Sequence, residues 1–204
     1  MTWRASKNAE AGELVLLSQD DARFSMSPTL RTPLGLKGQR PIVGTLGCHE
    51  LVYVFGALNL VTGRLTTHLV EKVRAHAQPK PRSLQVGFAR HMRDIARAYP
   101  ATQYPRVVLV IDNAPWHRGA LVTQALRAFP HLECYRLPRY SPQLQLIERF
   151  WEVLRRRATH NRLLRALTQL KRASRNSLCY DQTLQHRVLS LIQSPRKRTH
   201  LSAA

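Results

Sequence analysis

The chain has 204 residues, of which 44% are hydrophobic, so it can form one domain with a sizeable core plus appendages. Its charge is unbalanced, because 32 lysines and arginines stand against 12 aspartates and glutamates and give a formal net charge of +20. This surplus favours a polyanionic partner, since neutralised phosphates release condensed counterions. We expect nucleic acid rather than an anionic membrane, because the sequence has no lipidation motif and no long basic amphipathic helix.

Cysteine usage and hydropathy exclude further classes of protein. Cys48, Cys134 and Cys179 are widely spaced and form no CxxC pair, which argues against a disulfide framework and against a zinc knuckle. The N-terminus lacks the apolar segment of a signal peptide, and the most apolar stretch, residues 51–61, is too short to cross a bilayer. We therefore expect a soluble protein of a reducing cytosol, with no membrane partner.

The first half of the chain predicts mainly strands. Residues 1–12 are polar, and we expect them to be flexible. A first strand at residues 13–17 runs into a polar, acidic segment, and residues 25–40 predict a long loop because they are rich in Pro, Gly, Ser and Thr. Apolar segments separated by turn residues then predict three antiparallel strands, at residues 41–48, 51–60 and 64–70.

The second half predicts alternating helices and strands. Apolar residues recur on one helical face between Ser83 and Tyr99, and the aliphatic run Val107–Ile111 predicts a strand buried on both faces. After it we expect a helix at 119–129, a short strand at 132–137, a helix that carries Glu148 and further helix at 160–192.

The order of these elements predicts an α/β fold, in which helices flank a mixed sheet. We expect one catalytic domain over residues 13–160 and a basic helical extension with a tail over residues 161–204.

Two carboxylates lie in segments that can bring them to one edge of the sheet. Asp112 directly follows the strand expected at 107–111, and open α/β sheets bind their ligands at the carboxyl ends of strands. Glu148 lies at the edge of the apolar stripe of its helix, where a side chain can point into a cleft. The residues of that stripe are Leu144, Ile147, Trp151 and Leu154.

A third carboxylate, Asp20 or Asp21, could join these two from the first strand. Three carboxylates in one place repel each other unless a cation lies between them, and such hard oxygen ligands suit Mg²⁺ or Mn²⁺ rather than zinc. Two such ions can assist phosphodiester displacement without a nucleophilic side chain. An isolated Asp after a strand is commonly only a turn residue, and an isolated helical Glu is commonly solvated. Each is therefore a candidate metal ligand only because of the sequence segments that surround it.

Those surroundings are two distinctive segments, Val110-Ile-Asp-Asn-Ala-Pro-Trp-His117 and Leu137-Pro-Arg-Tyr-Ser-Pro-Gln-Leu-Gln-Leu-Ile-Glu-Arg-Phe-Trp151. Together they resemble the mariner-like DDE transposases of bacterial insertion sequences, including the spacing from aspartate to glutamate. The segments Gln19–Phe24, Lys37–Pro41 and Ala158–Arg162 fit more loosely. The resemblance covers roughly residues 13–165.

This resemblance implies a ribonuclease-H-like fold and a triad of acidic residues that is both catalytic and metal-binding. Asp20, Asp112 and Glu148 match the three acidic positions and would hold Mg²⁺ or Mn²⁺, with two ions expected. Asp21 falls where the family usually has glutamate, so the choice between Asp20 and Asp21 stays open. Secondary candidates are Asn113 and His117; His117 could orient a scissile phosphate or a metal-bound water, or could equally be a packed histidine near a turn.

The resemblance also implies cleavage of DNA at transposon ends, transfer of the strand to target DNA, and a homodimer as the active form. It places the protein in the bacterial cytoplasm, on the nucleoid.

Two features depart from the family. Gln145-Leu146 replaces the usual Asn-Pro, which removes a preset φ at the start of the helix that carries Glu148. The N-terminal helix-turn-helix domains of the family are also missing, so we expect either the second reading frame of a split element, with a separately encoded helix-turn-helix subunit, or an inactive truncated remnant that only binds DNA.

Basic residues concentrate late in the chain. From Arg149 onward there are 13 lysines and arginines against Glu152 and Asp181, which supplies +11 of the net charge. A charged run is commonly only a solvated face, but the nearby carboxylates favour a track for the DNA backbone, which positions DNA without reading its sequence. The expected DNA-binding residues are Arg149, Arg155, Arg156, Arg157, Arg162, Arg165, Lys171 and Arg172. A basic RNA-binding protein of ribosomal type would not need the two acidic segments.

Overall fold

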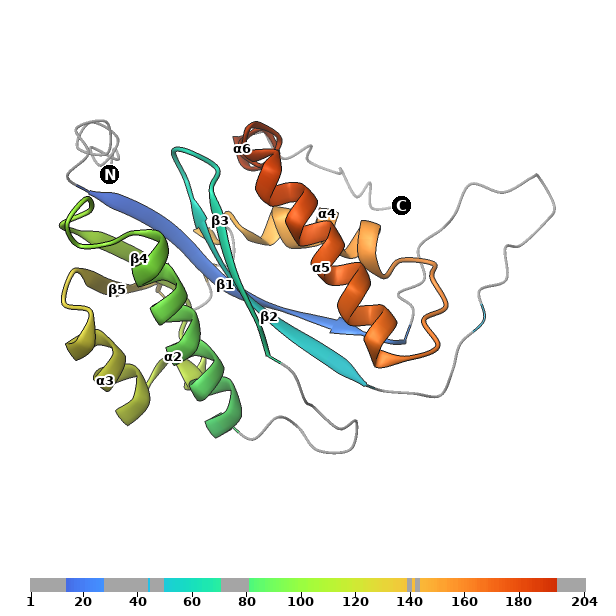
Figure 1. The fold of residues 1–204 in the computed structure, drawn as a ribbon, viewed down its shortest axis with the longest axis horizontal. Helices are drawn as coiled ribbons and strands as arrows, with labels where there is room; N and C mark the ends of the chain where they lie inside the picture. Colours follow the sequence, from blue (N-terminus) through green and yellow to red (C-terminus); the bar gives the residue numbers. More distant parts are fainter. Residues whose placement is uncertain are drawn as a thin grey trace, which may run out of the picture.

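The structure is a computed structural model that describes residues 14–27, 44, 50–70, 81–138, 141 and 144–193. Its centre is a five-stranded mixed sheet with the strand order β3-β2-β1-β4-β5 (Figure 1). The strands are β1 (Val15–Ser25), β2 (Leu51–Asn59), β3 (Leu65–Val70), β4 (Val107–Ile111) and β5 (Leu132–Arg136). Strands β1, β2 and β3 pair antiparallel, whereas β4 pairs in parallel with both β1 and β5.

The central strand β1 is longer than its sequence pattern predicts. We expected a strand only to residue 17, but β1 continues to Ser25 and pairs with β2 over the register from Leu17–Asn59 to Ser25–Leu51. Successive side chains of a strand point to opposite faces of the sheet. Leu17 therefore packs in one hydrophobic core, and Phe24 packs in another.

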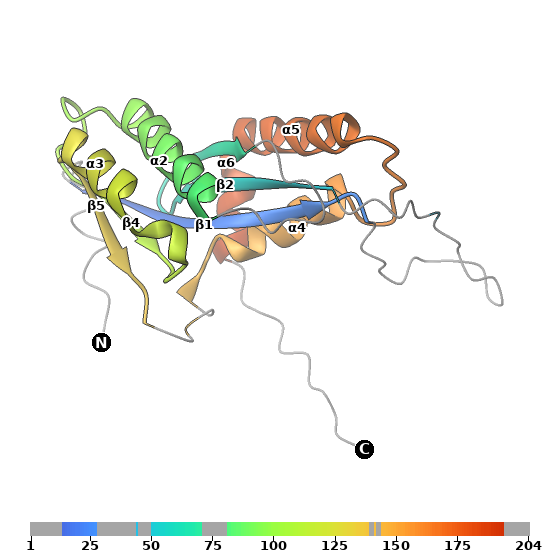
Figure 2. The ribbon, with the colours of Figure 1, turned by 90° about the horizontal axis from the view of Figure 1, so that it is seen from below.

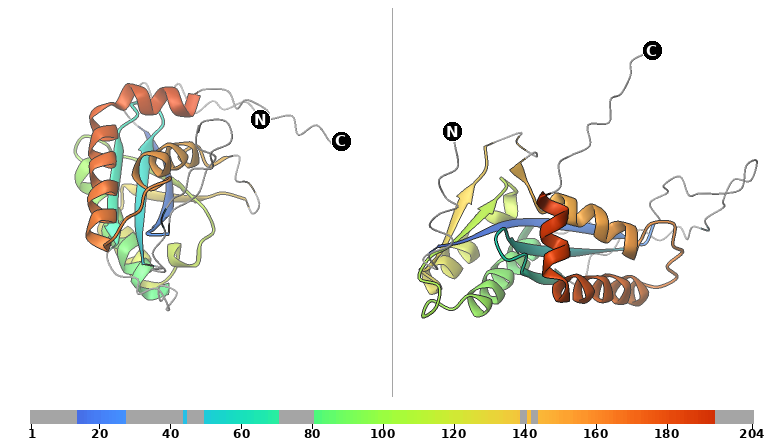
Figure 3. Two further views of the ribbon diagram at one scale, coloured as in Figure 1. Left: turned by 90° about the vertical axis from the view of Figure 1, so that its right-hand side faces the viewer. Right: turned by 90° about the horizontal axis from the view of Figure 1, so that it is seen from above.

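Helices complete these two cores. Helices α2 (Pro81–Ala98) and α3 (Ala120–Ala128), with the short 3₁₀ helix η1 (Pro115–His117), lie beside β4 and β5. Helices α4 (Glu148–Ala158), α5 (Leu167–Thr183) and α6 (Gln185–Gln193) share the second core with β1, β2 and β3. Figures 2 and 3 show α5 beside the long β1–β2 pair, toward the opposite end of the molecule from α3.

Most of the expected elements are confirmed, with two differences. The strand at 107–111 has the expected bounds, but it is not buried on both faces: Val108 and Val110 are only half-buried, because they lie on the same side of β4 as the cleft that Asp112 lines. The helical segment expected at 160–192 begins only at Leu167. Residues 159–166 are not helical, and Asn161 has a φ of 53°, which is outside the helical region.

The hydrophobic core crosses residue 160, where we expected a domain boundary. Leu170 and Leu178 of α5 and Val188 and Ile192 of α6 are buried with the residues of α4. The boundary between a catalytic domain and an extension stays a prediction. The expectations for residues 1–12 and 25–40, for a strand at 41–48 and for the tail after 193 concern residues that lie wholly or largely outside the described ones.

Two observations bear on the expected class of protein. Within the described segments, every helix is too short or too polar to cross a membrane. Cys134 and Cys179, the two cysteines that the structure describes, are both free thiols, as their spacing predicts.

Candidate active site

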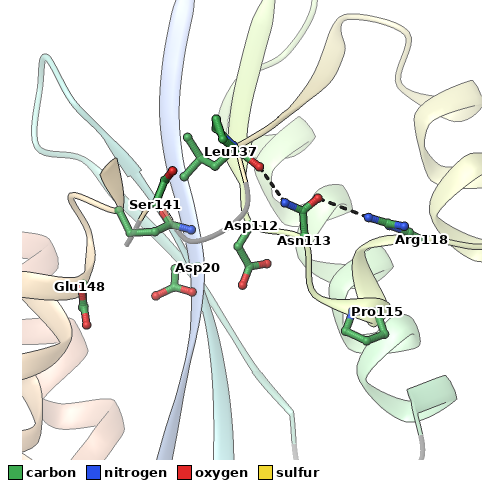
Figure 4. A pocket seen from close by; sticks show the side chains of 10 residues that line it. Asp20, Asp112, Asn113, Pro115, Arg118, Leu137, Ser141 and Glu148 are labelled. Carbon is green, nitrogen blue, oxygen red and sulfur yellow. Dashed lines mark hydrogen bonds between the residues drawn. The ribbon is translucent and has the colours of Figure 1, made fainter. Parts of the chain in front are cut away.

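A cleft of ≈ 850 Å³ lies between the end of β4 and the start of α4. Its lining includes Asp20 from β1, Asp112 directly after β4 and Glu148, the first residue of α4. Figure 4 shows these three carboxyl groups in the cleft, with Asp20 between Asp112 and Glu148. The structure therefore brings together the three acidic residues that the sequence singled out. The remaining lining residues are Asn113, Pro115, Arg118, Leu137, Pro138, Ser141 and Gln145.

Asp20 and Asp21 lie on opposite faces of the sheet. Asp20 pairs across the sheet with Gly56 and lines the cleft. Asp21 points toward the core of α2, where its Oδ1 accepts a hydrogen bond of 3.1 Å from the indole Nε1 of Trp116. Of the two residues between which the sequence left the choice open, only Asp20 therefore lies with Asp112 and Glu148.

The carboxylates of the cleft influence one another electrostatically. Burial raises the pKa of Asp20 to about 7, and the negative charges of Asp21, Asp112 and Glu148 add to the increase, against a backbone hydrogen bond from Asp21. Burial also raises the pKa of Asp21, to about 6, although His117 and the hydrogen bond from Trp116 act in the opposite direction. A cation between the carboxylates of the cleft would therefore relieve a real repulsion.

His117 holds the carboxyl group of Asp112. Its Nδ1 lies 2.8 Å from Oδ1 of Asp112, and the backbone N–H of Ala114 donates to the same oxygen at 2.9 Å. Burial would raise the pKa of Asp112, but these two hydrogen bonds, together with the charge interaction with His117, hold the pKa below its ordinary value. The ring of His117 is 1% exposed and packs against Phe88, with 4.4 Å between centroids. His117 is therefore a packed histidine, and its hydrogen bond orients the carboxyl group of Asp112.

The packing of α4 on β2 sets the position of Glu148. A Cβ atom at Gly56 would lie 2.6 Å from the ring of Trp151, so only glycine allows this close approach. Because Gly56 is the cross-strand partner of Asp20, the contact brings the start of α4 next to Asp20. The helix begins at Glu148 despite the missing proline before it.

The apolar stripe predicted for this helix is mostly confirmed. Ile147, Trp151 and Leu154 are buried, and Trp151 is a core residue, as expected. Leu144 is 49% exposed, so its assignment to the stripe is wrong, because it precedes the first turn of the helix. Glu152 is exposed, as expected for a solvated position.

Asn113 and Arg118 form the wall of the cleft beside Asp112. The side-chain amide of Asn113 donates to the carbonyl oxygen of Leu137 at 2.7 Å and so joins the segments that follow β4 and β5. Its Oδ1 accepts a hydrogen bond of 3.3 Å from Nη2 of Arg118 (Figure 4). Arg118 was not among the site residues expected from the sequence. Its place directly after His117, in the segment that carries Asp112, is the signal that could have identified it.

The expected DNA-binding residues fall into two groups. Arg157 forms an ion pair with the buried Asp181 of α5, and Nη1 of Arg149 donates to the carbonyl oxygen of Ile192 at 3.3 Å, so these two side chains join helices. The others lie at or near the surface: Arg156, Arg162, Arg165 and Arg172 are exposed, and Arg155 and Lys171 are half-buried.

Comparison with known proteins identifies the family. The model of the family described as DDE superfamily endonuclease matches residues 15–171. The chain belongs to this family. It is 23% identical over 158 residues to the insertion element IS630 uncharacterized 39 kDa protein of Shigella sonnei, a match that covers 78% of this chain and 43% of that protein. The chain thus spans less than half the length of that relative.

Solved structures similar to this chain support the fold. The Mos1 mariner paired end complex with Mn has a TM-score of 0.58 at 14% identity, and the match covers 87% of this chain and 53% of that chain. The catalytic domain of Mos1 mariner transposase has a TM-score of 0.56 at 14% identity, covering 87% and 76%. The ribonuclease-H-like mixed sheet flanked by helices that the sequence predicted is confirmed.

The donor set of the cleft fits a hard divalent cation. Asp20, Asp112 and Glu148 offer only carboxylate oxygens, which Mg²⁺ and Mn²⁺ prefer to the nitrogen and sulfur ligands of zinc sites. Among the described residues, no group of three His, Cys, Asp or Glu side chains is close enough to hold an ion as they stand. The carboxyl groups would have to rotate toward each other to share one cation.

Proposed function

We propose that this chain is the catalytic domain of a transposase, which cleaves DNA at the ends of a mobile element and transfers the freed strand with the help of Mg²⁺ or Mn²⁺. The observation that carries the proposal is the presence of Asp20, Asp112 and Glu148 in one cleft of a DDE-family chain. Relatives of similar fold include a Mos1 strand transfer complex and Mos1 paired end complexes with Mn and with Mg.

In this proposal each residue of the cleft has a distinct task. Asp20, Asp112 and Glu148 would hold the metal, with two ions expected, and the bound ions would supply Lewis acidity to the attacking and leaving oxygens. His117 keeps the carboxyl group of Asp112 oriented, and its hydrogen bond keeps that group ionised. The contact of Trp151 with Gly56 keeps Glu148 near Asp20. No nucleophilic side chain is required, because water and then a 3′-hydroxyl of DNA would attack.

DNA would bind over the basic side chains around this cleft. The net charge of +20 supplies a general attraction to phosphates, which depends strongly on salt. We assign the backbone track to the exposed arginines of and beyond α4, rather than to Arg157, whose charge Asp181 compensates. The separately encoded helix-turn-helix subunit, the homodimer and the association with the nucleoid belong to the same proposal. Among the arginines that the sequence predicted to bind DNA, Arg156, Arg162, Arg165 and Arg172 are exposed.

Nicking of supercoiled plasmid by the purified chain, with Mn²⁺ and without it, tests the function. We expect nicking only with metal. Asp112→Asn and Glu148→Gln should abolish it while DNA binding, measured by fluorescence anisotropy, persists. Glu152→Gln is the matched control, because Glu152 is an exposed carboxylate on the same helix. Equal nicking by Glu148→Gln and Glu152→Gln would exclude this active site.

The alternative is an inactive remnant that only binds DNA. Calorimetric titration of the chain with Mn²⁺ separates the two functions, because a remnant would bind DNA and show no heat of metal binding. Metal binding that is lost in Asp112→Asn supports the active domain.

A further inference from the structure

We propose that Arg118 is a phosphate-binding residue of the cleft, which holds the backbone of the DNA strand next to the carboxylates. Asn113 is its positioning residue. This inference rests on the proposed function, because it takes the same cleft as the place where DNA enters.

The charge of the cleft gives the first argument. Of the ten described residues that line it, Arg118 carries the only positive charge, whereas three carry carboxyl groups (Figure 4). A DNA phosphate that approaches Asp112 is repelled unless positive charge lies close by. A guanidinium group suits this task, because its planar set of N–H donors matches two phosphate oxygens at once.

The state of the Arg118 side chain gives the second argument. Arg118 is exposed, and its guanidinium donates a hydrogen bond to the neutral amide oxygen of Asn113. Among the described residues, no carboxylate lies within ion-pair distance of Arg118, in contrast to Arg157, which Asp181 neutralises. The charge of Arg118 is therefore available to a ligand, and its side chain is already oriented.

The backbone beneath Arg118 is also fixed, which gives the third argument. The side-chain amide of Gln85, on α2, donates to the carbonyl oxygen of Arg118. Gly119 follows with a φ of 106°, and a Cβ atom there would collide with the amide of Gln85. Asn113, in turn, is anchored to the carbonyl oxygen of Leu137. Contacts from three parts of the chain thus hold the backbone of Arg118 and, through Asn113, its exposed guanidinium at the rim of the cleft.

The test compares Arg118→Ala with Arg127→Ala. Arg127 is an exposed arginine near the far end of α3, and α3 runs from the cleft back to the start of β5 at the opposite end of the sheet. Binding to a 30-base-pair duplex is measured by fluorescence anisotropy at several salt concentrations, without metal. Loss of one phosphate contact should lower the slope of log K against log salt by about 1 in Arg118→Ala and leave it unchanged in Arg127→Ala.

Nicking of plasmid with Mn²⁺ gives the second readout. We expect Arg118→Ala to lower the rate by roughly 10- to 100-fold, and Arg118→Lys to restore part of it, because lysine keeps the charge without the planar set of donors. Arg127→Ala should nick at the wild-type rate. A wild-type salt slope together with a wild-type nicking rate in Arg118→Ala would overturn the inference. Thermal unfolding of each variant checks the fold, and Arg118→Gln, which retains a donor for Asn113, replaces the alanine variant if that unfolds.

The two readouts separate this inference from the proposed function. If the wild-type chain binds DNA but never nicks it, the proposed function fails, while the salt slope still tests Arg118. If the wild-type chain nicks DNA and Arg118→Ala matches it in both readouts, only the role of Arg118 fails.

Discussion

Asp20 and Asp21 are neighbours on β1, yet they lie in opposite environments. Asp20 faces the cleft, whereas Asp21 faces α2 and accepts a hydrogen bond from Trp116. The alternation of side chains along a strand produces this difference on its own. It shows that the pleat of β1, rather than closeness in sequence, selects the carboxylate that can share a cation with Asp112.

The two carboxyl groups also differ in what surrounds their charge. Burial raises the pKa of both, but the neighbours of Asp20 are further acids, whereas Trp116 and His117 stabilise the ionised form of Asp21. The negative charge of Asp21 is thus stabilised by neighbouring groups of the protein itself. A backbone hydrogen bond from Asp21 also stabilises the ionised form of Asp20, but no positive charge acts on the pKa of Asp20, so a bound cation would stabilise that form further.

The largest expected effect is on activity. Asp20→Asn should lower Mn²⁺-dependent nicking by about 10³-fold or more, as expected for loss of a metal-binding catalytic group. Asp21→Asn should change the rate less than about 10-fold, because asparagine still offers Trp116 an oxygen acceptor. Single-turnover nicking of plasmid measures both rates. The distinction between the two faces fails if Asp21→Asn loses as much activity as Asp20→Asn.

The next effect is on stability, in the core that positions Glu148. Trp151 is 1% exposed and packs on Gly56, so Trp151→Ala should lower the free energy of unfolding by about 3–5 kcal/mol. Urea denaturation followed by circular dichroism measures it. Trp116→Phe, on the other side of β1, is the matched control: it keeps most of the aromatic volume and loses only the hydrogen bond to Asp21, at about 1 kcal/mol. Equal losses would contradict the central role of Trp151.

A third effect separates Arg157 from Arg156, its neighbour on α4. Arg157→Ala leaves the buried Asp181 without its ion partner and should cost about 2–4 kcal/mol of stability. Arg156→Ala, at an exposed position, should leave stability within about 0.5 kcal/mol. Urea denaturation again measures both. Point substitutions are preferable to removal of residues 160–204, because α5 and α6 contribute to the core. A stable Arg157→Ala protein would show that the ion pair is dispensable.

Local patterns in the sequence predicted much of the fold. Six residues of α2 recur at helical spacing, and all six are buried. A helix with a single apolar face packs that face against the core. Those residues are Leu84, Phe88, His91, Met92, Ile95 and Ala96. The second half of β1 was missed for the opposite reason. Its residues from Ser18 to Asp21 are polar although they lie in a central strand, and of these four Asp20 lines the cleft.

The composition of the site was partly predictable, but its geometry was not. Asp112 and Glu148 stand in recognisable segments, whereas the choice of Asp20 over Asp21 depends on the register of β1 against β2. The contact of Gly56 with Trp151 joins residues nearly a hundred positions apart, and no local pattern reveals it. Arg118 was missed because its environment arises only when the segments after β4 and β5 meet.

A smaller effect on activity concerns His117, which orients Asp112. His117→Ala should lower the rate of nicking by about 10- to 100-fold, as is common when a partner of a metal ligand is lost. His117→Asn can place an N–H donor near the position of Nδ1 and should recover part of the rate. The Mn²⁺ concentration required for half-maximal nicking should rise in the alanine variant, which a loss of packing alone would not cause. Unchanged metal dependence in His117→Ala would exclude the positioning role.

The smallest effect is on the stability of the metal-free chain. Because the pKa of Asp20 rises from 3.8 to about 7 on folding, the folded state binds more protons than the unfolded state between these values. The contribution of Asp20 to stability therefore falls as pH rises from about 4 to 7. In EDTA at pH 8, Asp20→Asn should raise the melting temperature by about 2–4 °C, which corresponds to about 1 kcal/mol. At pH 4 the difference should vanish.

Added Mn²⁺ should reverse the order of the melting temperatures of the wild type and Asp20→Asn. In the proposed site Mn²⁺ would bind the folded chain through Asp20, so it should raise the melting temperature of the wild type at pH 8 and have little effect on Asp20→Asn. Asp21→Asn should keep the wild-type response to Mn²⁺, because Asp21 lies on the other face of β1. Differential scanning fluorimetry with EDTA and with Mn²⁺ measures all three proteins. A metal response that is lost in Asp21→Asn and retained in Asp20→Asn would reverse the assignment of the two faces, and with it the identity of the first acidic residue of the site.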